Sequence, residues 1–245
     1  YLPFRDKAEP QVTLRPLLPG EAAMIRLRME STNGVDQKTA KSLYERAAPI
    51  AARFPDDPVA QGWFAEIAHD AGEIEAGQKA ADLVLVRDPK SVQGLLYKAR
   101  LRIRELVRDK VHDPAAWQAA RSTIIAANRL DPNNAEPLWE FWKSFAAQGV
   151  PPVKSAFTGL YRAQELTPQD DDVRYAAAVA RVQAGEEDWA RALLRPLAYD
   201  PHAKGDNPAA RMLAALDAGL KGNAVLAAAE GAPVLNDTGS GTSPK

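Results

Sequence analysis

The sequence predicts an all-α fold made of repeated helical hairpins, and the first observation behind this prediction is a periodic proline. Prolines that follow an amphipathic stretch occur at Pro55, Pro89, Pro132, Pro168 and Pro201, which are separated by 34, 43, 36 and 33 residues. A period near 34 residues is typical of a repeat that contains two helices. Because proline cannot continue a helix and restricts the residue before it, each position predicts the end of a hairpin.

The second observation is that each interval contains two amphipathic stretches with a break between them. In the first interval, residues 59–71 carry apolar side chains at helical spacing, Gly72 breaks the pattern, and residues 74–86 follow. In the last interval, residues 172–184 and 189–199 repeat this arrangement around a glycine. One hairpin cannot bury its own apolar face, so stacked hairpins are expected to form the core.

The remaining helices follow in chain order. Residues 18–31 and 35–54 predict a first pair, and residues 207–222 with the short stretch 223–231 predict a last one. The interval of 43 residues is nine residues longer than the period of 34, which predicts a long helix over 91–110. Asp and Pro at positions 113 and 114 then predict the start of the next helix.

Composition outside the periodic region predicts two flanking segments. Residues 1–19 contain four prolines and no helical period, which predicts an extended arm or linker. Residues 20–230 are expected to form the repeat domain, and residues 231–245 have the polar, small-residue composition of a disordered tail.

The stretches "NRLDPNNAEPLWEFWKSFAAQG" and "QAGEEDWARALLRPLAYDP" resemble the tetratricopeptide repeat (TPR) family. The small residues of the family pattern match Gly149 and Gly185 at the turn between helices, and Ala127, Ala156, Ala163 and Ala190 in the second helices. The Leu-Gly pair of the family's first helix is missing. The resemblance implies a right-handed TPR-like superhelix of about five to six hairpins, which binds proteins or peptides on its concave face.

A second resemblance is carried by "SVQGLLYKAR", "AANRLDPNNAEPLWEFW" and "RPLAYDPHA". These phrases are similar to the C-terminal helical half of exported alphaproteobacterial proteins that have a metallopeptidase-like N-terminal domain. The resemblance implies that the chain is the non-catalytic part of a longer protein in the periplasm or outside the cell. No catalytic residue can be transferred to this chain.

Composition excludes several classes of function. The net charge of −1 argues against a nucleic-acid partner, and the absence of cysteine excludes disulfides and thiolate metal sites. No apolar run approaches the roughly 20 residues of a membrane span. The three histidines are far apart in the sequence, and neither a His-Glu-x-x-His motif nor a phosphate-binding loop is present. We therefore expect no enzyme activity, no cofactor and no metal.

The predicted long helix carries an unusual number of basic residues: Lys98, Arg100, Arg102, Arg104, Arg108 and Lys110. Basic residues at alternate positions lie about 200° apart on a helix, so they spread over two flanks. Two interpretations remain open at this point. The basic residues pair with neighbouring acids on a solvated helix, or they bind an acidic segment of a partner.

The TPR resemblance implies which side chains line the concave groove. By its register, the candidate contacts for a peptide or protein are Leu96, Arg100, Trp139, Lys143 and Tyr175. Exposed aromatic and arginine side chains are frequent anchors of binding surfaces. The alternative for Trp139 is packing in the core or against another domain, since aromatic residues crowd positions 139–145.

Two hypotheses for the function follow. In the first, the chain is a non-catalytic module that binds a protein or peptide in its groove. In the second, it is an intramolecular scaffold that docks an upstream peptidase-like domain.

Overall fold

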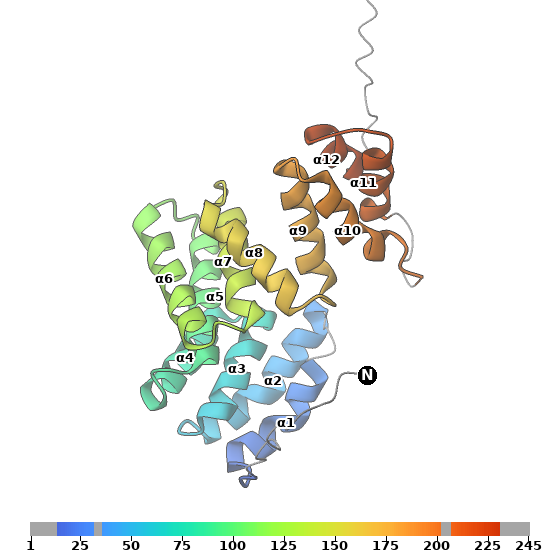
Figure 1. Cartoon of the computed structure of the whole chain (residues 1–245). Helices are drawn as coiled ribbons and strands as arrows, with labels where there is room; N and C mark the ends of the chain where they lie inside the picture. Colours follow the sequence, from blue (N-terminus) through green and yellow to red (C-terminus); the bar gives the residue numbers. More distant parts are fainter. Residues whose placement is uncertain (1–13, 32–35, 202–206, 231–245) are drawn as a thin grey trace, which may run out of the picture. The chain divides into compact units, whose positions relative to one another are not determined.

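The computed structural model describes residues 14–31, 36–201 and 207–230. Within these ranges the chain forms twelve helices and no strand, which confirms the predicted all-α fold (Figure 1). The first five helices are α1 (Pro19–Ser31), α2 (Gln37–Arg53), α3 (Pro58–Ala71), α4 (Ile74–Arg87) and α5 (Val92–Arg108). The other seven are α6 (Pro114–Leu130), α7 (Ala135–Gln148), α8 (Lys154–Leu166), α9 (Asp171–Gln183), α10 (Glu187–Ala198), α11 (Pro208–Asp217) and α12 (Asn223–Ala229).

The helices belong to two compact units. Unit 1 (Tyr1–Val111) contains α1 to α5, and unit 2 (His112–Lys245) contains α6 to α12. The first and last described helices begin and end within one residue of the predicted repeat region 20–230. Residues 1–13 of the predicted arm and residues 231–245 of the predicted tail lie outside the described residues.

The Asp and Asn residues beside the turns begin the helices, as the sequence predicts for Asp113. The side chains of Asp57, Asp113, Asn134, Asp170 and Asn207 each accept a hydrogen bond from a backbone N–H in the first turn of the following helix. Proline occupies the first helical position after Asp57, Asp113 and Asn207, where its missing N–H costs nothing. These caps account for the Asp-Pro and Asn-Pro pairs that begin α3, α6 and α11, whereas Asp88 and Asp131, which also precede a proline, follow the last residue of a helix.

The turns inside the hairpins depend on glycine. Gly72, Gly149 and Gly185 have φ angles of 84°, 76° and 72°, in the left-handed region that disfavours residues with a Cβ. All three are glycines that the repeat pattern places between two helices. The left-handed residue ends the first helix and turns the chain into the second.

Short side chains let the helices pack closely. The four alanines that match the small positions of the TPR pattern, Ala127, Ala156, Ala163 and Ala190, are all fully buried at 0% exposure. A core cluster in unit 1 joins α1 to α5 through residues that include Met24, Leu43, Phe64, Ala80 and Leu101. In unit 2, one cluster is formed by α7, α8 and α9, and another by α9 to α12.

The long helix predicted over 91–110 is observed as α5, which is as long as α2 and α6. Helix α5 has 17 residues, and the Ser91 hydroxyl caps it by accepting the Gly94 N–H at 3.1 Å. The helix ends at Asp109, and Lys110 follows with a φ of 51°. The predicted range of 91–110 is therefore correct to within two residues at each end.

Candidate functional site

The five predicted groove residues lie on three helices in the two units. Leu96 and Arg100 are on α5 of unit 1, whereas Trp139 and Lys143 are on α7 and Tyr175 is on α9 of unit 2. The predicted site therefore divides into two parts, one in each unit.

Leu96 does not have the exposure that a groove contact needs, because only 2% of its surface is accessible. The reason lies in helix α5, which buries two faces. One face contains Leu96, Ala99, Ile103 and Leu106, and the other contains Gly94, Tyr97 and Leu101. The alignment with the TPR pattern assumes that the first helix of each pair leaves one face exposed to the groove. This assumption is wrong at Leu96, which we remove from the candidate contacts.

Arg100 is half-buried, and its guanidinium carbon lies 5.0 Å from the ring centre of Tyr97 one turn earlier. Tyr97 is 7% exposed. This cation–aromatic contact covers the ring with the arginine of the same helix. It orients Arg100 along α5.

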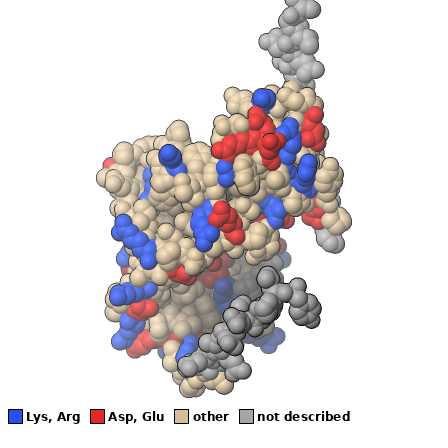
Figure 2. All heavy atoms as spheres, in the orientation of Figure 1, with Lys and Arg blue, Asp and Glu red and all other residues tan. Residues whose placement is uncertain are grey.

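The basic residues of α5 pair mainly with nearby acids. Lys98 lies 2.6 Å from Asp82, Arg102 lies 2.5 Å from Glu105, and Arg108 contacts Glu75 at 2.7 Å and Asp109 at 2.8 Å. The hydrogen bond from Arg102, followed by the weaker one from Gln78, lowers the pKa of the Glu105 carboxyl against the opposing effect of burial. These contacts support the interpretation of a solvated helix with internal ion pairs. On the face that Figure 2 shows, basic and acidic side chains are interspersed.

Trp139 and Lys143 form a contact on α7. The ammonium nitrogen of Lys143 lies 5.6 Å from the ring centre of Trp139 and 3.0 Å from a carboxylate oxygen of Glu140. Trp139 is half-buried against a cluster that contains Leu160 and Ala163. The core therefore fixes the orientation of the indole, while the helix surface supplies a cation next to it.

Tyr175 is the second aromatic candidate in unit 2. It is half-buried against the cluster of α9 to α12, which includes Met212 and Leu216. Burial raises the pKa of the Tyr175 phenol, and the positive charge of Arg211 partly opposes this change. The hydroxyl therefore stays protonated at neutral pH and can donate a hydrogen bond.

Sequence reasoning missed a cation–aromatic cluster in unit 2. The guanidinium carbon of Arg181 lies 3.6 Å from the ring centre of Tyr161 and 5.4 Å from that of Trp189, and Arg181 also pairs with Glu186. The three residues of the cluster come from α8, α9 and α10. Trp189 is 62% exposed. Only the pair Arg181 and Glu186, on either side of the Gly185 turn, could have been suspected from their spacing.

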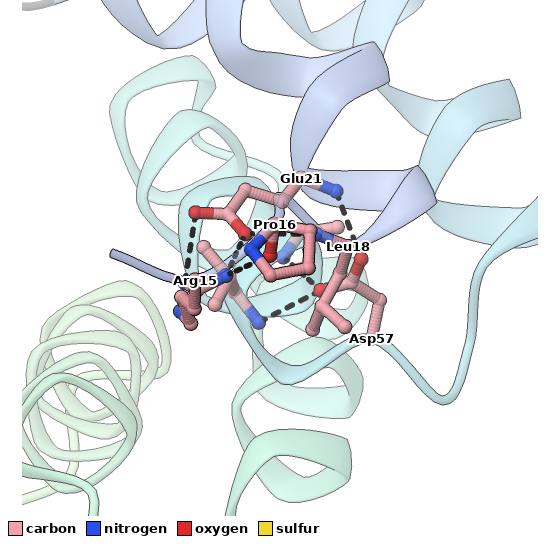
Figure 3. Close-up of polar contacts among 7 residues, drawn as sticks. Arg15, Pro16, Leu18, Glu21 and Asp57 are labelled. Atoms are coloured by element: carbon pink, nitrogen blue, oxygen red, sulfur yellow. Dashed lines mark hydrogen bonds and ion pairs between the residues drawn. The ribbon is translucent and has the colours of Figure 1, made fainter. Parts of the chain in front are cut away.

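A polar network that was not foreseen ties the start of α1 to the start of α3 (Figure 3). The guanidinium of Arg15 donates to both carboxylate oxygens of Glu21, at 2.7 and 3.0 Å. One of these oxygens also accepts the N–H of Leu18 at 3.1 Å. The N–H of Glu21 donates to the Asp57 carboxylate at 2.8 Å. Contacts with Arg15 and Leu18 lower the pKa of the Glu21 carboxyl, and burial opposes this change.

This lowered pKa predicts that the contribution of Glu21 to stability is lost in acid. The folded-state value lies below the ordinary value of about 4.3, so the unfolded chain takes up the proton first as the pH falls. The stabilisation is therefore present above that ordinary value and disappears as the pH falls through the folded-state pKa. Thermal unfolding should show a difference in Tm between wild type and Glu21→Gln that is larger at about pH 7 than at about pH 2. An equal difference at both pH values would contradict this assignment.

The described residues contain no group of three His, Asp or Glu side chains that could hold a metal ion. In the same part of the chain, no helix is both long and apolar enough to cross a membrane.

Comparison with known proteins identifies similar folds. The structure resembles TTC0263, a thermophilic TPR protein of Thermus thermophilus, with a TM-score of 0.59, 19% identity, and coverage of 75% of this chain and 92% of the other. Two structures of MamA give lower scores. The MamA RS-1 ArsTM double mutant has a TM-score of 0.48 at 12% identity, with coverage of 72% and 90%. MamA itself has a TM-score of 0.49 at 12% identity, with coverage of 74% and 93%.

No protein-family model matches the sequence, and no curated protein is significantly similar to it. The assignment therefore depends on structure. Within the two units, five pairs of successive helices pack against each other: α1 with α2, α3 with α4, α7 with α8, α9 with α10 and α11 with α12. Their turns and small residues occupy the repeat positions, and the Thermus protein has a similar fold. The chain has a TPR-like helical-repeat fold.

Proposed function

We propose that the chain is a non-catalytic helical-repeat module that binds a protein or peptide. The first helices α7 and α9 of unit 2 carry the binding surface in this proposal, through Trp139, Lys143 and Tyr175. Stacked helical pairs form extended surfaces that suit such partners. The proposal includes no cofactor and no nucleic acid, in keeping with the net charge of −1.

The contact between Trp139 and Lys143 is the observation that carries this proposal. An indole held by the core presents a rigid anchor, so less conformational entropy is lost when a partner binds. The neighbouring ammonium group, 5.6 Å from the ring centre, adds a polar contact beside the apolar one. Tryptophan and tyrosine are the residues that most often dominate the binding energy of interfaces.

We expect Trp139→Ala to weaken the binding of peptides selected on the intact chain from a random peptide library. The expected loss is about 30-fold, because truncation of a dominant aromatic anchor costs about 2 kcal/mol. Fluorescence anisotropy with labelled peptides would measure it. The matched control is Trp189→Ala, which removes an exposed tryptophan from the second helix α10 and should leave the affinity unchanged. Equal affinities for wild type and Trp139→Ala would exclude this surface.

The alternative is an intramolecular scaffold that docks an upstream peptidase-like domain. Apolar side chains just before α1 favour it, because Leu14 and Leu17 are 90% and 51% exposed. The start of α1 also borders a cavity of about 300 Å³, which is lined by residues that include Leu18, Pro19 and Phe54. A periplasmic or extracellular location would accompany this function.

The coding sequence that precedes the Tyr1 codon would test the alternative. A signal peptide followed by a domain with a His-Glu-x-x-His helix would support the scaffold. A start codon directly upstream would contradict it.

A further inference from the structure

Unit 2 contains a second candidate site around Arg121 of α6, which binds α7 through uncharged groups alone. Its Nε donates to the Ser144 hydroxyl at 2.8 Å, and its Nη2 donates to the Ser144 carbonyl at 3.0 Å and to Oε1 of Gln148 at 2.6 Å. Burial lowers the pKa of Arg121, and no carboxylate of the described residues opposes this change. The guanidinium is therefore a partly desolvated cation without a counter-ion in the described part of the chain.

Two other half-buried arginines show the usual alternative. Arg28 lies 2.7 Å from a carboxylate oxygen of Glu66, and Arg191 lies 3.1 Å from one of Asp188. Burial of a charge costs free energy unless an opposite charge pairs with it. A carboxylate that is brought by a ligand would give Arg121 the partner that Arg28 and Arg191 already have.

Two nitrogen atoms at this site have no acceptor among the described residues. They are Nη1 of Arg121 and Nε2 of Gln148, and both carry N–H donors. Neither atom is sealed from solvent, in contrast to the buried and unpaired Nε atoms of Arg174 and Arg181. The site therefore offers several accessible donors and a single positive charge. This combination suits a carboxylate better than a phosphate, whose second negative charge would stay unpaired.

Aromatic rings fix the orientation of the guanidinium. Its carbon lies 3.9 Å from the ring centre of Phe145 and 5.7 Å from that of Trp117. These two rings are 5% and 2% exposed, so the core holds them in place. Together with the three hydrogen bonds to α7, they orient Arg121 before a ligand arrives, which lowers the entropic cost of binding.

We propose that Arg121 and Gln148 bind a carboxylate of a peptide or protein partner, from an Asp or Glu side chain or from a C-terminus. One carboxylate oxygen accepts from Nη1 of Arg121, and Nε2 of Gln148 supplies the second donor. The choice of a protein as the source of the carboxylate rests on the proposed function. The site is separate from the Trp139 surface, because Gln148 follows Trp139 by nine residues and lies about 180° around α7.

NMR titration of the intact chain with N-acetylglutamate α-amide and N-acetylglutamine α-amide would test the proposal for a side-chain carboxylate. N-acetylglycine and N-acetylglycinamide form the matching pair for a C-terminal carboxylate. In at least one pair we expect the carboxylate to bind about tenfold more tightly than its amide, because it forms a charge-assisted hydrogen bond. The Nε–H signal of Arg121 should shift. If neither carboxylate binds more tightly than its matched amide, or if inorganic phosphate binds more tightly than both, the proposal is overturned.

Gln148→Glu is the decisive variant, because it supplies the missing carboxylate from within the chain. Oε1 of Gln148 already lies 2.6 Å from Nη2 of Arg121, so the new charge should pair with the guanidinium and raise the Tm. The affinity for the carboxylate ligands should fall at least about tenfold.

Gln183→Glu is the matched control, since it adds the same charge at an exposed position of α9 and should leave the affinity unchanged. Unchanged binding in Gln148→Glu would overturn the site. Trp139→Ala should leave these titrations as they are in the wild type, so failure here is distinguishable from failure of the proposed function.

Discussion

Leu101→Ala is expected to lower the free energy of unfolding of unit 1 by about 3 kcal/mol. Leu101 is fully buried on α5 and belongs to the cluster that joins α1 to α5. Its methyl groups lie directly over Gly77 of α4, so truncation opens a cavity between these helices. Urea unfolding would measure the change. Val86→Ala, at a position on α4 that is 75% exposed, is the control and should change stability by less than about 0.5 kcal/mol.

The contact between Leu101 and Gly77 also predicts that the effect of Gly77→Ala on stability changes sign when Leu101 is truncated. A Cβ at Gly77 would lie 2.8 and 2.9 Å from the two methyl carbons of Leu101, so Gly77→Ala should destabilise the wild type by overpacking. In the Leu101→Ala background both of these contacts are absent, and the nearest remaining atom is the Cβ of Ala68 at 3.3 Å, a tight contact that a shift of a few tenths of an ångström relieves. The higher helix propensity of alanine should then stabilise the protein by about 1 kcal/mol. The same effect of Gly77→Ala in both backgrounds would contradict the contact, and a double-mutant cycle measures the coupling.

Asp57→Ala is expected to cost about 2 kcal/mol, because one carboxylate caps two helices. One oxygen accepts the N–H groups of Val59 and Ala60 in α3, at 3.1 and 3.0 Å. The other accepts the N–H of Glu21 in α1 at 2.8 Å. The aspartate is only 7% exposed, so water cannot readily replace these bonds.

Two further variants make this prediction specific. Asp57→Asn retains one acceptor oxygen, which can cap α3, and should cost about 1 kcal/mol through the lost contact with Glu21. Ser91→Ala removes the single cap of α5 and should also cost about 1 kcal/mol. Urea unfolding would measure the loss of stability in each variant. If Asp57→Ala loses no more stability than Ser91→Ala, the shared cap is contradicted.

The turns and helix starts that were predicted correctly depend only on residues that are close together in the sequence. Gly72 and Gly149 mark turns because only glycine readily adopts their left-handed φ angles. Asp113 with the following proline marks the start of α6, because capping and a fixed φ act within one turn. The spacing of such signals also predicted the bounds of α5 to within two residues. The extra residues of that interval are shared, however, because α5 and α6 both have 17 residues whereas α3 and α4 have 14.

The candidate site was predicted less completely. The sequence placed Trp139, Lys143 and Tyr175 on first helices, where the structure also has them, and their role in binding stays a prediction. It could not show that Leu96 is buried, because a helix with apolar residues on two faces does not reveal how many neighbours cover it.

By itself, the sequence determined the helical class, the repeat period and the positions of the turns, since these follow from backbone preferences over a few residues. Only the tertiary structure decided which side chains meet across helices: Asp57 with the Glu21 N–H, 36 residues apart, and Arg181 with Tyr161 and Trp189. Such contacts depend on the rotation of each helix about its axis. Packing of small residues such as Ala163 and Ala190 determines that rotation, and no local preference encodes it.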